Sequence, residues 1–503
     1  MIGENIIRKY FRVAVAPKGH SSQTKSERVP IRGNRRAKAL LFCLFALLVV
    51  IISETTIAAA PIVHWKCTTA ADPWVDQPDI TAQGGNSDPS AQVIAVDSNQ
   101  RFQTIDGWGG CFNERGWRAM QVLSDEQRTN VMRMMFDPKD GLKLNICRTP
   151  IAASDYAIDL YSYDETAGDF QMKYFSIDRD RKLLIPYIKA AMAIGPDLKL
   201  WAVPWSPPSW MKDSGKLAGG HILTDPRTMD ALALYFAKYV QAYQAAGIPL
   251  YMVMPQNEPC YSNGYTSCVW SGDEMDIFVR NHLGPLFKQL KVDCQIYLGT
   301  IPRSDPEKLD YNYWLSEALD DPLTRSYITG VGCQWSGGDV MRDAHDKNPG
   351  LKLMQTEAEC GKTNTNDWDF ASKRFEQVVK YLDCGAESYM IWNLVLDETG
   401  LSTAKWAQCS PIVINQSTQQ VTYTPYYYAF RHFSSFVRPG AVRIATASTL
   451  TQCDAFFNPG GQVVLVVENA SDTVAPITLK FAERAFPAVL PAKSFSTFVL
   501  DTR

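Results

Sequence analysis

The feature that most constrains the fold of this 503-residue chain is an alternation of short apolar runs with longer amphipathic stretches, which begins near residue 102. The runs have the length of strands and are apolar throughout, which indicates strands buried on both faces of a parallel sheet. The stretches between them have the spacing of helices that cover such a sheet. The strand-like runs are 104–106, 144–148, 198–203, 250–255, 295–299, 328–333, 351–355 and 388–392. The helical stretches include 124–136, 181–193, 225–246, 272–290 and 370–384.

Eight strand–helix units are enough to close a (β/α)₈ barrel, a fold of about 250 residues or more. The main alternative is an open, doubly wound sheet, in which a G-x-G-x-x-G turn commonly follows the first strand. No such turn follows the first predicted strand here. The sequence therefore predicts an α/β protein with a (β/α)₈ TIM barrel over residues 101–436.

Both chain ends differ from this pattern. After about residue 436 the helical period fades, and 437–503 contains alternating runs such as 463–467 and 495–500, broken by Asn, Pro and Gly. Alternation of this kind is typical of half-buried strands. Residues 61–100 are rich in Pro, Asp, Ser and Thr and contain short apolar stretches. We therefore expect a small side β-sandwich, built from the C-terminal segment together with N-terminal strands in 61–100.

Residues 1–60 have the pattern of a secretory signal. A basic region precedes an unbroken apolar run at 39–52, and small residues follow at 58–60. The run is shorter than the ~20 residues of a membrane-spanning helix, so we expect a cleaved signal peptide and a secreted, extracellular or periplasmic protein. An uncleaved signal anchor, which would place the protein at a membrane, remains open. The sequence leaves the oligomeric state undetermined.

The composition limits which ligands and binding partners are expected. The formal net charge of −3 provides no basic surface for nucleic acid. The thirteen Trp suit sugar binding, because an indole face packs on the C–H face of a pyranose. Neither a metal nor a cofactor is expected, since there is no C-x-x-C pair and only six His. If the chain is exported, disulfides are permitted, and Cys260 with Cys268 is the best candidate pair; the other pairings stay open.

Two acidic residues follow apolar strands at positions where a barrel carries its active site. Glu258 comes after the fourth predicted strand and Glu357 after the seventh. The active site of a (β/α)₈ barrel lies at the carboxyl ends of the strands, so the two side chains are expected to face each other across the barrel mouth. A helix-start role for Glu258 and a functional role for Glu359 in place of Glu357 are the alternatives.

Such a pair suits the cleavage of a glycosidic bond with retention of configuration. That reaction needs two carboxyl groups about 5 Å apart, one protonated to donate to the leaving oxygen and one ionised to attack the anomeric carbon. Two close carboxyls couple, so that ionisation of one raises the pKa of the other. Asn257, beside Glu258, has an amide that could bond a sugar 2-hydroxyl or the nucleophile.

A set of motifs in barrel order makes the chain resemble glycoside hydrolase family 30, which includes glucosylceramidases, β-1,6-glucanases and some β-xylosidases. The resemblance extends from about residue 100 to the C-terminus. Each motif alone is weak, but together and in this order they are specific. They are DGWGG at 106–110, RTPI at 148–151, WSPP at 205–208, WMK at 210–212, QNEP at 256–259, QTEAECG at 355–361 and WNL at 392–394.

The resemblance implies a role for each matching residue. Glu258 is similar to the family's acid/base and Glu357 to its nucleophile, which implies a β-linked glucan or glucoside as substrate. The remaining matches imply substrate-binding or supporting positions, and these are Asn257, Arg148, Asp155, Trp205 and Trp392. The alternative for Arg148 is a structural ion pair, and for the two tryptophans a place in the core.

One segment departs from the family. Many members carry a His-x-Tyr pair after the sixth strand, where this chain has CQWS at 333–336, and we expect Gln334 to contact substrate there. The departure and the 356–361 segment resemble the β-1,6-glucanase branch more than the glucosylceramidases. The prediction is a secreted retaining endo-β-1,6-glucanase. A glucosylceramidase-like or β-xylosidase specificity is the alternative, and a carbohydrate-binding protein without catalysis is the alternative from another class.

Overall fold

The computed structural model describes residues 61–83, 90–303, 312–450 and 452–502. The predicted secretory segment lies outside these residues. Within them, no helix combines the length and the apolar character that crossing a membrane requires.

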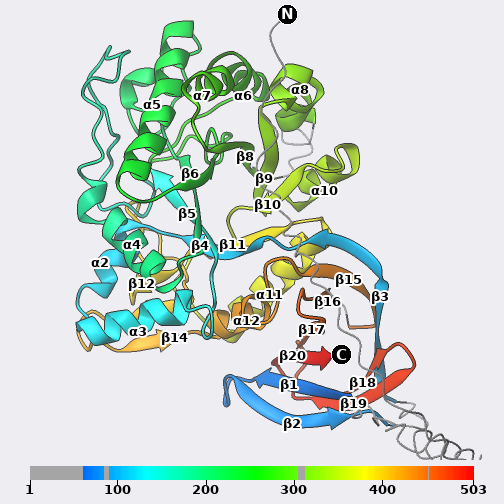
Figure 1. Cartoon of the computed structure of the whole chain (residues 1–503). Helices are drawn as coiled ribbons and strands as arrows, with labels where there is room; N and C mark the ends of the chain where they lie inside the picture. Colours follow the sequence, from blue (N-terminus) through cyan, green and yellow to red (C-terminus); the bar gives the residue numbers. More distant parts are fainter. Residues whose placement is uncertain (1–60, 84–89, 304–311, 451, 503) are drawn as a thin grey trace, which may run out of the picture. The chain divides into compact units, whose positions relative to one another are not determined.

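Eight parallel strands close into a barrel, which confirms the predicted fold class. The strands are paired in chain order, and the last pairs with the first (Figure 1). They are β4 (Gly107–Cys111), β5 (Ile146–Ile151), β6 (Lys199–Pro204), β7 (Leu250–Val253), β8 (Gln295–Arg303), β9 (Ile328–Ser336), β10 (Lys352–Gln355) and β11 (Ser388–Asn393).

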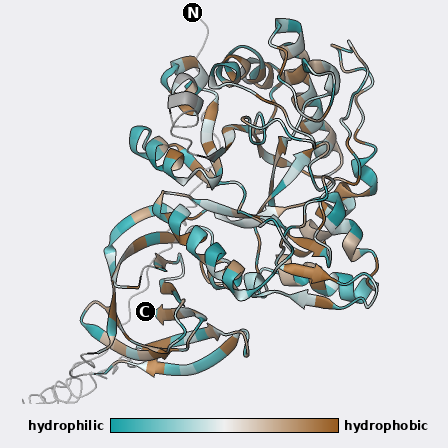
Figure 2. Ribbon diagram, turned by 180° about the vertical axis from the view of Figure 1, so that it is seen from behind, coloured by the Kyte–Doolittle hydropathy of each residue, from teal (hydrophilic) through white to brown (hydrophobic). Residues whose placement is uncertain are grey.

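The helices that follow these strands are amphipathic. The longest begins after Asp225, whose side chain accepts a hydrogen bond from the amide of Thr228, and Pro226 occupies its first turn. Figure 2 shows helices with hydrophilic and hydrophobic segments side by side. The helices are α2 (Glu114–Met120), α3 (Asp125–Phe136), α4 (Leu184–Ile194), α5 (Pro226–Ala245), α6 (Gly272–Phe278), α7 (Gly284–Leu290), α8 (Glu317–Asp320), α9 (Pro322–Arg325), α10 (Gly338–Lys347), α11 (Trp368–Asp383) and α12 (Pro425–Ser434).

The first barrel strand lies later than predicted. The sequence pattern placed it at 104–106, but Thr104 ends a strand of the other sheet and the barrel strand is β4. The error arises because three of the five residues of β4 are glycines, which carry no apolar signal. Glycine is required there by close approach: a Cβ on Gly109 would lie 1.5 Å from the carbonyl oxygen of Ile146 on the neighbouring strand.

The second sheet has nine strands and is built from both chain ends, as predicted (Figure 1). β1 of the N-terminal segment lies between β2 and β20, so the first and last strands of the described chain are hydrogen-bonded neighbours. Alternate residues of β17 face two cores, one within this sheet and one shared with the barrel. The strands are β1 (Ile62–Thr68), β2 (Val75–Thr81), β3 (Gln92–Thr104), β15 (Val442–Ser448), β16 (Cys453–Phe457), β17 (Gln462–Asn469), β18 (Ala475–Phe481), β19 (Arg484–Leu490) and β20 (Ser494–Asp501).

Two further features concern the loops. Three short strands, β12 (Val395–Asp397), β13 (Ile412–Ile414) and β14 (Val421–Tyr423), form a small sheet after the last barrel strand. The predicted disulfide between Cys260 and Cys268 is not formed in the structure. Cys268 is a buried free thiol, and its Sγ lies 3.7 Å from the carbonyl oxygen of Val269.

Candidate active site

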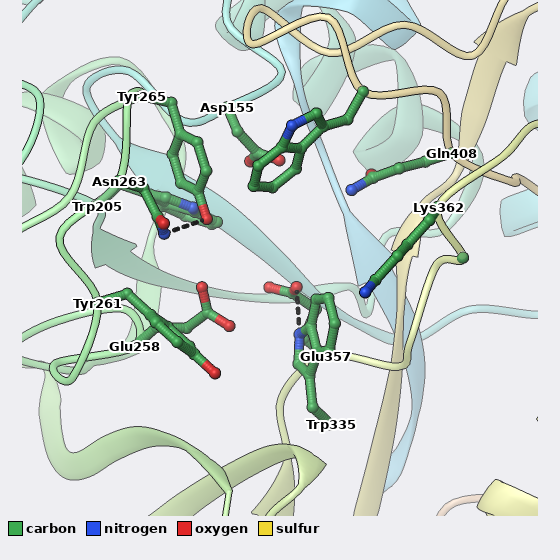
Figure 3. A pocket seen from close by; sticks show the side chains of 12 residues that line it. Asp155, Trp205, Glu258, Tyr261, Asn263, Tyr265, Trp335, Glu357, Lys362 and Gln408 are labelled. Carbon is green, nitrogen blue, oxygen red and sulfur yellow. Dashed lines mark hydrogen bonds between the residues drawn. The ribbon is translucent and has the colours of Figure 1, made fainter.

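A pocket of about 390 Å³ opens where the barrel strands end, and four of the predicted site residues line it: Asp155, Trp205, Glu258 and Glu357. Glu258 follows β7 and Glu357 follows β10. Figure 3 shows their carboxyl groups pointing toward the same space from opposite walls. The sequence prediction that these two side chains meet at the barrel mouth therefore agrees with the geometry.

Glu357 is held by two donors of different kinds. Its Oε2 lies 2.6 Å from Nη1 of Arg148, and its Oε1 accepts a hydrogen bond of 2.9 Å from the indole nitrogen of Trp335. Both bonds favour the charged carboxylate. Glu359, the alternative in the sequence, instead pairs with Arg374 at 3.2 Å and does not line the pocket.

Arg148 connects the ends of three barrel strands. It is fully buried on β5, and its Nη2 donates a hydrogen bond of 2.5 Å to Oδ1 of Asn257, the residue before Glu258. Its guanidinium lies over the ring of Trp205 at 4.2 Å and over that of Trp392 at 5.5 Å. The two rings stabilise the buried positive charge through cation–π contacts, and the N–H groups of the guanidinium remain available to hydrogen-bond the carboxylate.

Glu258 has an unusual backbone. It is not in a helix, and its φ of 46° lies in the left-handed region that side chains other than glycine rarely adopt. The conformation is fixed on both sides, since the amide of Glu258 donates to Oγ1 of Thr300 at 3.2 Å and the amide of Asn257 donates to the carbonyl of Pro204 at 2.8 Å. Backbone strain of this kind is concentrated at functional sites, where it aims a side chain.

The surroundings give the two glutamates unequal proton affinities. Burial raises the pKa of Glu258 to about 8, and the negative charge of Glu357 adds to that effect. Burial also raises the pKa of Glu357, but Arg148 and the Trp335 hydrogen bond oppose the rise. At neutral pH the shared negative charge therefore lies on Glu357, and Glu258 keeps its proton.

Asp155 provides a third carboxyl in the pocket. Burial raises its pKa to about 8, with a further contribution from the charge of Glu357. Its Oδ1 is buried and accepts no hydrogen bond from any residue in the part of the chain that is described. A protonated carboxyl with an unused oxygen can both donate to and accept from a sugar hydroxyl.

Four predicted residues lie behind the pocket wall and do not line it: Arg148, Asn257, Trp392 and Gln334. Trp392 stacks on Trp205 with ring centroids 5.2 Å apart, so it supports the tryptophan that does line the pocket. Gln334 is fully buried; its Oε1 accepts from Thr356 Oγ1 at 3.1 Å, and its side chain lowers the pKa of both glutamates.

Comparison with known protein families agrees with this geometry. The model described as the glycosyl hydrolase family 30 TIM-barrel domain matches residues 105–437, and the family 30 beta sandwich domain matches 440–498. The chain belongs to glycosyl hydrolase family 30. It is therefore a glycoside hydrolase, and enzymes of family 30 act on β-linked glycosides.

Two of the activities named among the chain's relatives are glucosylceramidase and endo-1,6-beta-glucanase. The chain is 32% identical over 439 residues to a Caenorhabditis elegans protein named "Putative glucosylceramidase 3", with 82% of each chain covered. It is 26% identical over 474 residues to an endo-1,6-beta-D-glucanase of Aspergillus fumigatus, which covers 87% of this chain and 93% of that protein. A solved endo-beta1,6-glucanase is similar with a TM-score of 0.75 and 25% identity, covering 87% of this chain and 99% of that one.

The sequence patterns missed most of the residues that complete the pocket of this family 30 hydrolase. They share one property, a position in a loop or at a strand end on the carboxyl side of the barrel. They are Tyr261, Asn263, Tyr265, Trp335, Gly361, Lys362, Trp406 and Gln408. Loops have no periodic pattern. Trp335, next to the predicted Gln334, and Gly361 and Lys362, at the end of the 355–361 motif, are the lining residues that a sequence signal could have identified.

Among the residues described, no group of three or more His, Cys, Asp and Glu side chains is arranged to hold a metal ion. The polar groups that face the pocket are three carboxyls with one indole N–H and amide, hydroxyl and lysine side chains. These groups can bind hydroxyls and transfer protons.

Proposed function

We propose that this family 30 hydrolase is a retaining endo-β-1,6-glucanase in which Glu357 is the nucleophile and Glu258 the general acid/base. The observation that carries the proposal is that two buried carboxyls face one cavity and that only Glu357 is held there by a cation and an indole donor, so that its pKa is raised less than that of Glu258. Retaining hydrolysis needs one ionised and one protonated carboxyl at the same time, and the site supplies both at neutral pH.

The mechanism follows from these positions. Glu357 attacks the anomeric carbon while Glu258 gives its proton to the leaving oxygen, and a covalent glycosyl-enzyme forms. The ester formed on Glu357 has no charge, so the repulsion that held the proton on Glu258 disappears. Glu258 then ionises more readily and takes a proton from the attacking water, which releases sugar with its β configuration kept.

The remaining predicted residues are proposed to hold the sugar and the nucleophile. Asp155 offers an unused buried oxygen to a hydroxyl, and Trp205, on which Trp392 stacks, contributes aromatic surface to the pocket wall. Asn257 has its oxygen occupied by Arg148, so its amide N–H₂ group is the part left to donate to a hydroxyl or to Glu357. Gln334, set behind the wall, is proposed to act on the glutamates and not on the sugar.

The chemistry of the pocket wall supports a glucan over a lipid-linked substrate. Among the described residues that line the pocket, the apolar surface is aromatic and no Leu, Ile, Val or Met side chain takes part. Aromatic rings interleaved with polar groups suit sugars, whereas a ceramide would need an aliphatic rim. The endo-1,6-glucanase relatives agree with this choice.

Glucosylceramidase activity is the second candidate, because the 32% identical relative and a mouse lysosomal acid glucosylceramidase, 26% identical, carry that name. Product analysis on pustulan, a β-1,6-glucan, with laminarin, xylan and glucosylceramide in parallel separates the candidates. Gentio-oligosaccharides from pustulan alone are expected. Turnover of glucosylceramide without cleavage of pustulan would refute the proposed substrate, while the fold and the family assignment would stand.

The residue roles have their own test. Glu357→Gln is expected to abolish turnover, and Glu258→Ala is expected to recover activity on aryl glucosides when azide replaces the lost acid/base. Sugar binding without turnover by the unaltered chain would support the non-catalytic alternative. Secretion, which we also propose, predicts that N-terminal sequencing of extracellular material begins near residues 58–60.

A further inference from the structure

Lys212 is a buried lysine for which the proposed reaction has no use. Its side chain is 3% exposed, although it lies outside the pocket. Its ammonium donates three hydrogen bonds, all to backbone carbonyls: 2.8 Å to Leu217, 2.7 Å to Gly219 and 2.9 Å to Ser267. An ammonium has three protons, so its donor capacity is fully used.

Two of these carbonyls belong to the loop that contains Lys212 itself. The loop is closed at its base, where the amide of Leu223 donates to the carbonyl of Met211 at 2.9 Å. Gly219 and Gly220 have φ values of 65° and 88°, a conformation that lets the backbone turn its carbonyl toward the ammonium inside the loop. Loop 211–223 is therefore wrapped around its own lysine.

The third carbonyl belongs to a second loop, 261–270, which follows β7. Ser267 in this loop is a junction, because its Oγ accepts hydrogen bonds from the amides of Gly219 at 3.1 Å and Asn263 at 2.8 Å. A further bond of 2.9 Å joins the amide of Val269 to the carbonyl of Gly220. The lysine thus lies where the two loops are tied together.

The second loop carries part of the pocket wall. Asn263 donates a hydrogen bond of 2.8 Å from Nδ2 to the hydroxyl of Tyr265, and both side chains line the pocket (Figure 3). Thr266 ties the same loop to the strand-end loop of Asp155 through a bond of 3.0 Å to the carbonyl of Ala153. A change in the conformation of loop 261–270 would therefore displace Asn263 and Tyr265, two side chains that line the pocket.

We propose that Lys212 is a positioning residue that fixes the Asn263–Tyr265 wall for substrate binding, acting through the carbonyl of Ser267. Without the ammonium, the carbonyl of Ser267 would lose its donor and the carbonyls of Leu217 and Gly219 would each lose one of two donors, so the loops would open to reach water. Glu258 and Glu357 are held by other bonds, to Thr300, Arg148 and Trp335. The lysine is thus expected to govern substrate affinity more than the chemical step.

The matched pair of variants is Lys212→Met and Lys143→Met. Lys143 is half-buried and also donates to a backbone carbonyl, that of Ser435 at 3.2 Å, but it does not line or adjoin the pocket. Lys212→Met is expected to raise KM for the hydrolysed glucan about 10-fold or more while kcat stays within about 3-fold, the pattern of lost uniform binding. Lys143→Met is expected to leave both constants unchanged.

Hydrogen–deuterium exchange provides a readout that does not depend on activity. In Lys212→Met the amides of Ser267 and Val269 are expected to exchange faster than in the unaltered chain, and in Lys143→Met they are expected to keep their protection. Unchanged KM and unchanged exchange in a folded Lys212→Met variant would overturn the proposal. Should no glycoside be hydrolysed by the unaltered chain, the proposed function fails, and exchange alone still decides the role of Lys212.

A second variant covers the case in which Lys212→Met does not fold. Ser267→Ala keeps the lysine and removes only the hydroxyl that joins Gly219 to Asn263. It is expected to raise KM in the same direction, and Lys212→Arg, which keeps the charge and donors, is expected to fall between the unaltered chain and Ser267→Ala. A KM unchanged in Ser267→Ala would contradict the route through this loop.

Discussion

The hydrogen bond from Trp335 to Glu357 yields a prediction whose size follows from the structure. The indole N–H lies 2.9 Å from Oε1 of Glu357 and lowers the pKa of that carboxyl. Trp335→Phe keeps an aromatic ring in the pocket and removes only the donor. The pKa of Glu357 is therefore expected to rise, since the charged form loses a bond that its protonated form does not need.

A hydrogen bond to a charged group contributes ~1.5–3 kcal/mol, and we take the lower end because the pocket is open to water. One pKa unit corresponds to ~1.36 kcal/mol, so the pKa of Glu357 should rise by about one unit. The acid limb of the kcat/KM profile reports the free-enzyme nucleophile and should move up by about one pH unit. Well below that limb, activity should be about 10-fold lower than in the unaltered enzyme.

Trp406→Phe is the matched control. Trp406 lines the same pocket and packs edge-on against Tyr265, and no hydrogen bond joins it to either glutamate in the described structure. Its removal is expected to change KM at all pH values and to leave the acid limb in place. An acid limb that stays in place in Trp335→Phe, or that moves equally in both variants, would refute the electrostatic reasoning.

Three further predictions concern single contacts. Arg148→Met leaves Glu357 buried without its cation, which should lower the free energy of unfolding by ~3–5 kcal/mol and the melting temperature with it. Without the cation Glu357 is more readily protonated and loses its nucleophilic form, so kcat/KM should also fall at least ~100-fold; a fully active variant would contradict this role of Arg148. Gln334→Leu removes a group that lowers the pKa of Glu258, so the alkaline limb, which reports loss of that proton, should move to higher pH; a limb that does not move would show that the amide does not act on Glu258. Gly109→Ala places a methyl against a neighbouring strand's carbonyl and should yield no folded protein by circular dichroism; a soluble variant with an unaltered melting curve would contradict the packing.

Most of the barrel could be predicted because buried parallel strands must be apolar along their whole length. Seven predicted runs coincide with β5 to β11 to within a few residues at each end. β4 could not be found in this way, since its glycines are set by the distance to the next strand and leave no apolar run. A strand is recognised in the sequence by its run of apolar side chains. This criterion fails for β4, because the close approach of the neighbouring strand leaves room only for glycine.

The two glutamates of the candidate site could be predicted from the sequence, but most of the loop residues around them could not. Glu258 and Glu357 were identified because strand ends of a barrel converge, and convergence is a property of topology that sequence order preserves. The wall residues Tyr261, Tyr265 and Trp406 come from loops, whose paths depend on hydrogen bonds such as those of Lys212 and Ser267. Bonds of this kind join residues far apart in the chain and leave no periodic pattern.

Glu357 is proposed to form the covalent intermediate, with Glu258 assisting as acid/base. The most direct test is to trap that intermediate with 2-deoxy-2-fluoro-β-D-glucosyl fluoride and to locate the label by peptide mass spectrometry. One glycosyl group is expected, attached to Glu357 and released on transfer to an added glucoside. A label on Glu359 or Glu258, or hydrolysis that inverts the anomeric configuration without forming an adduct, would contradict it.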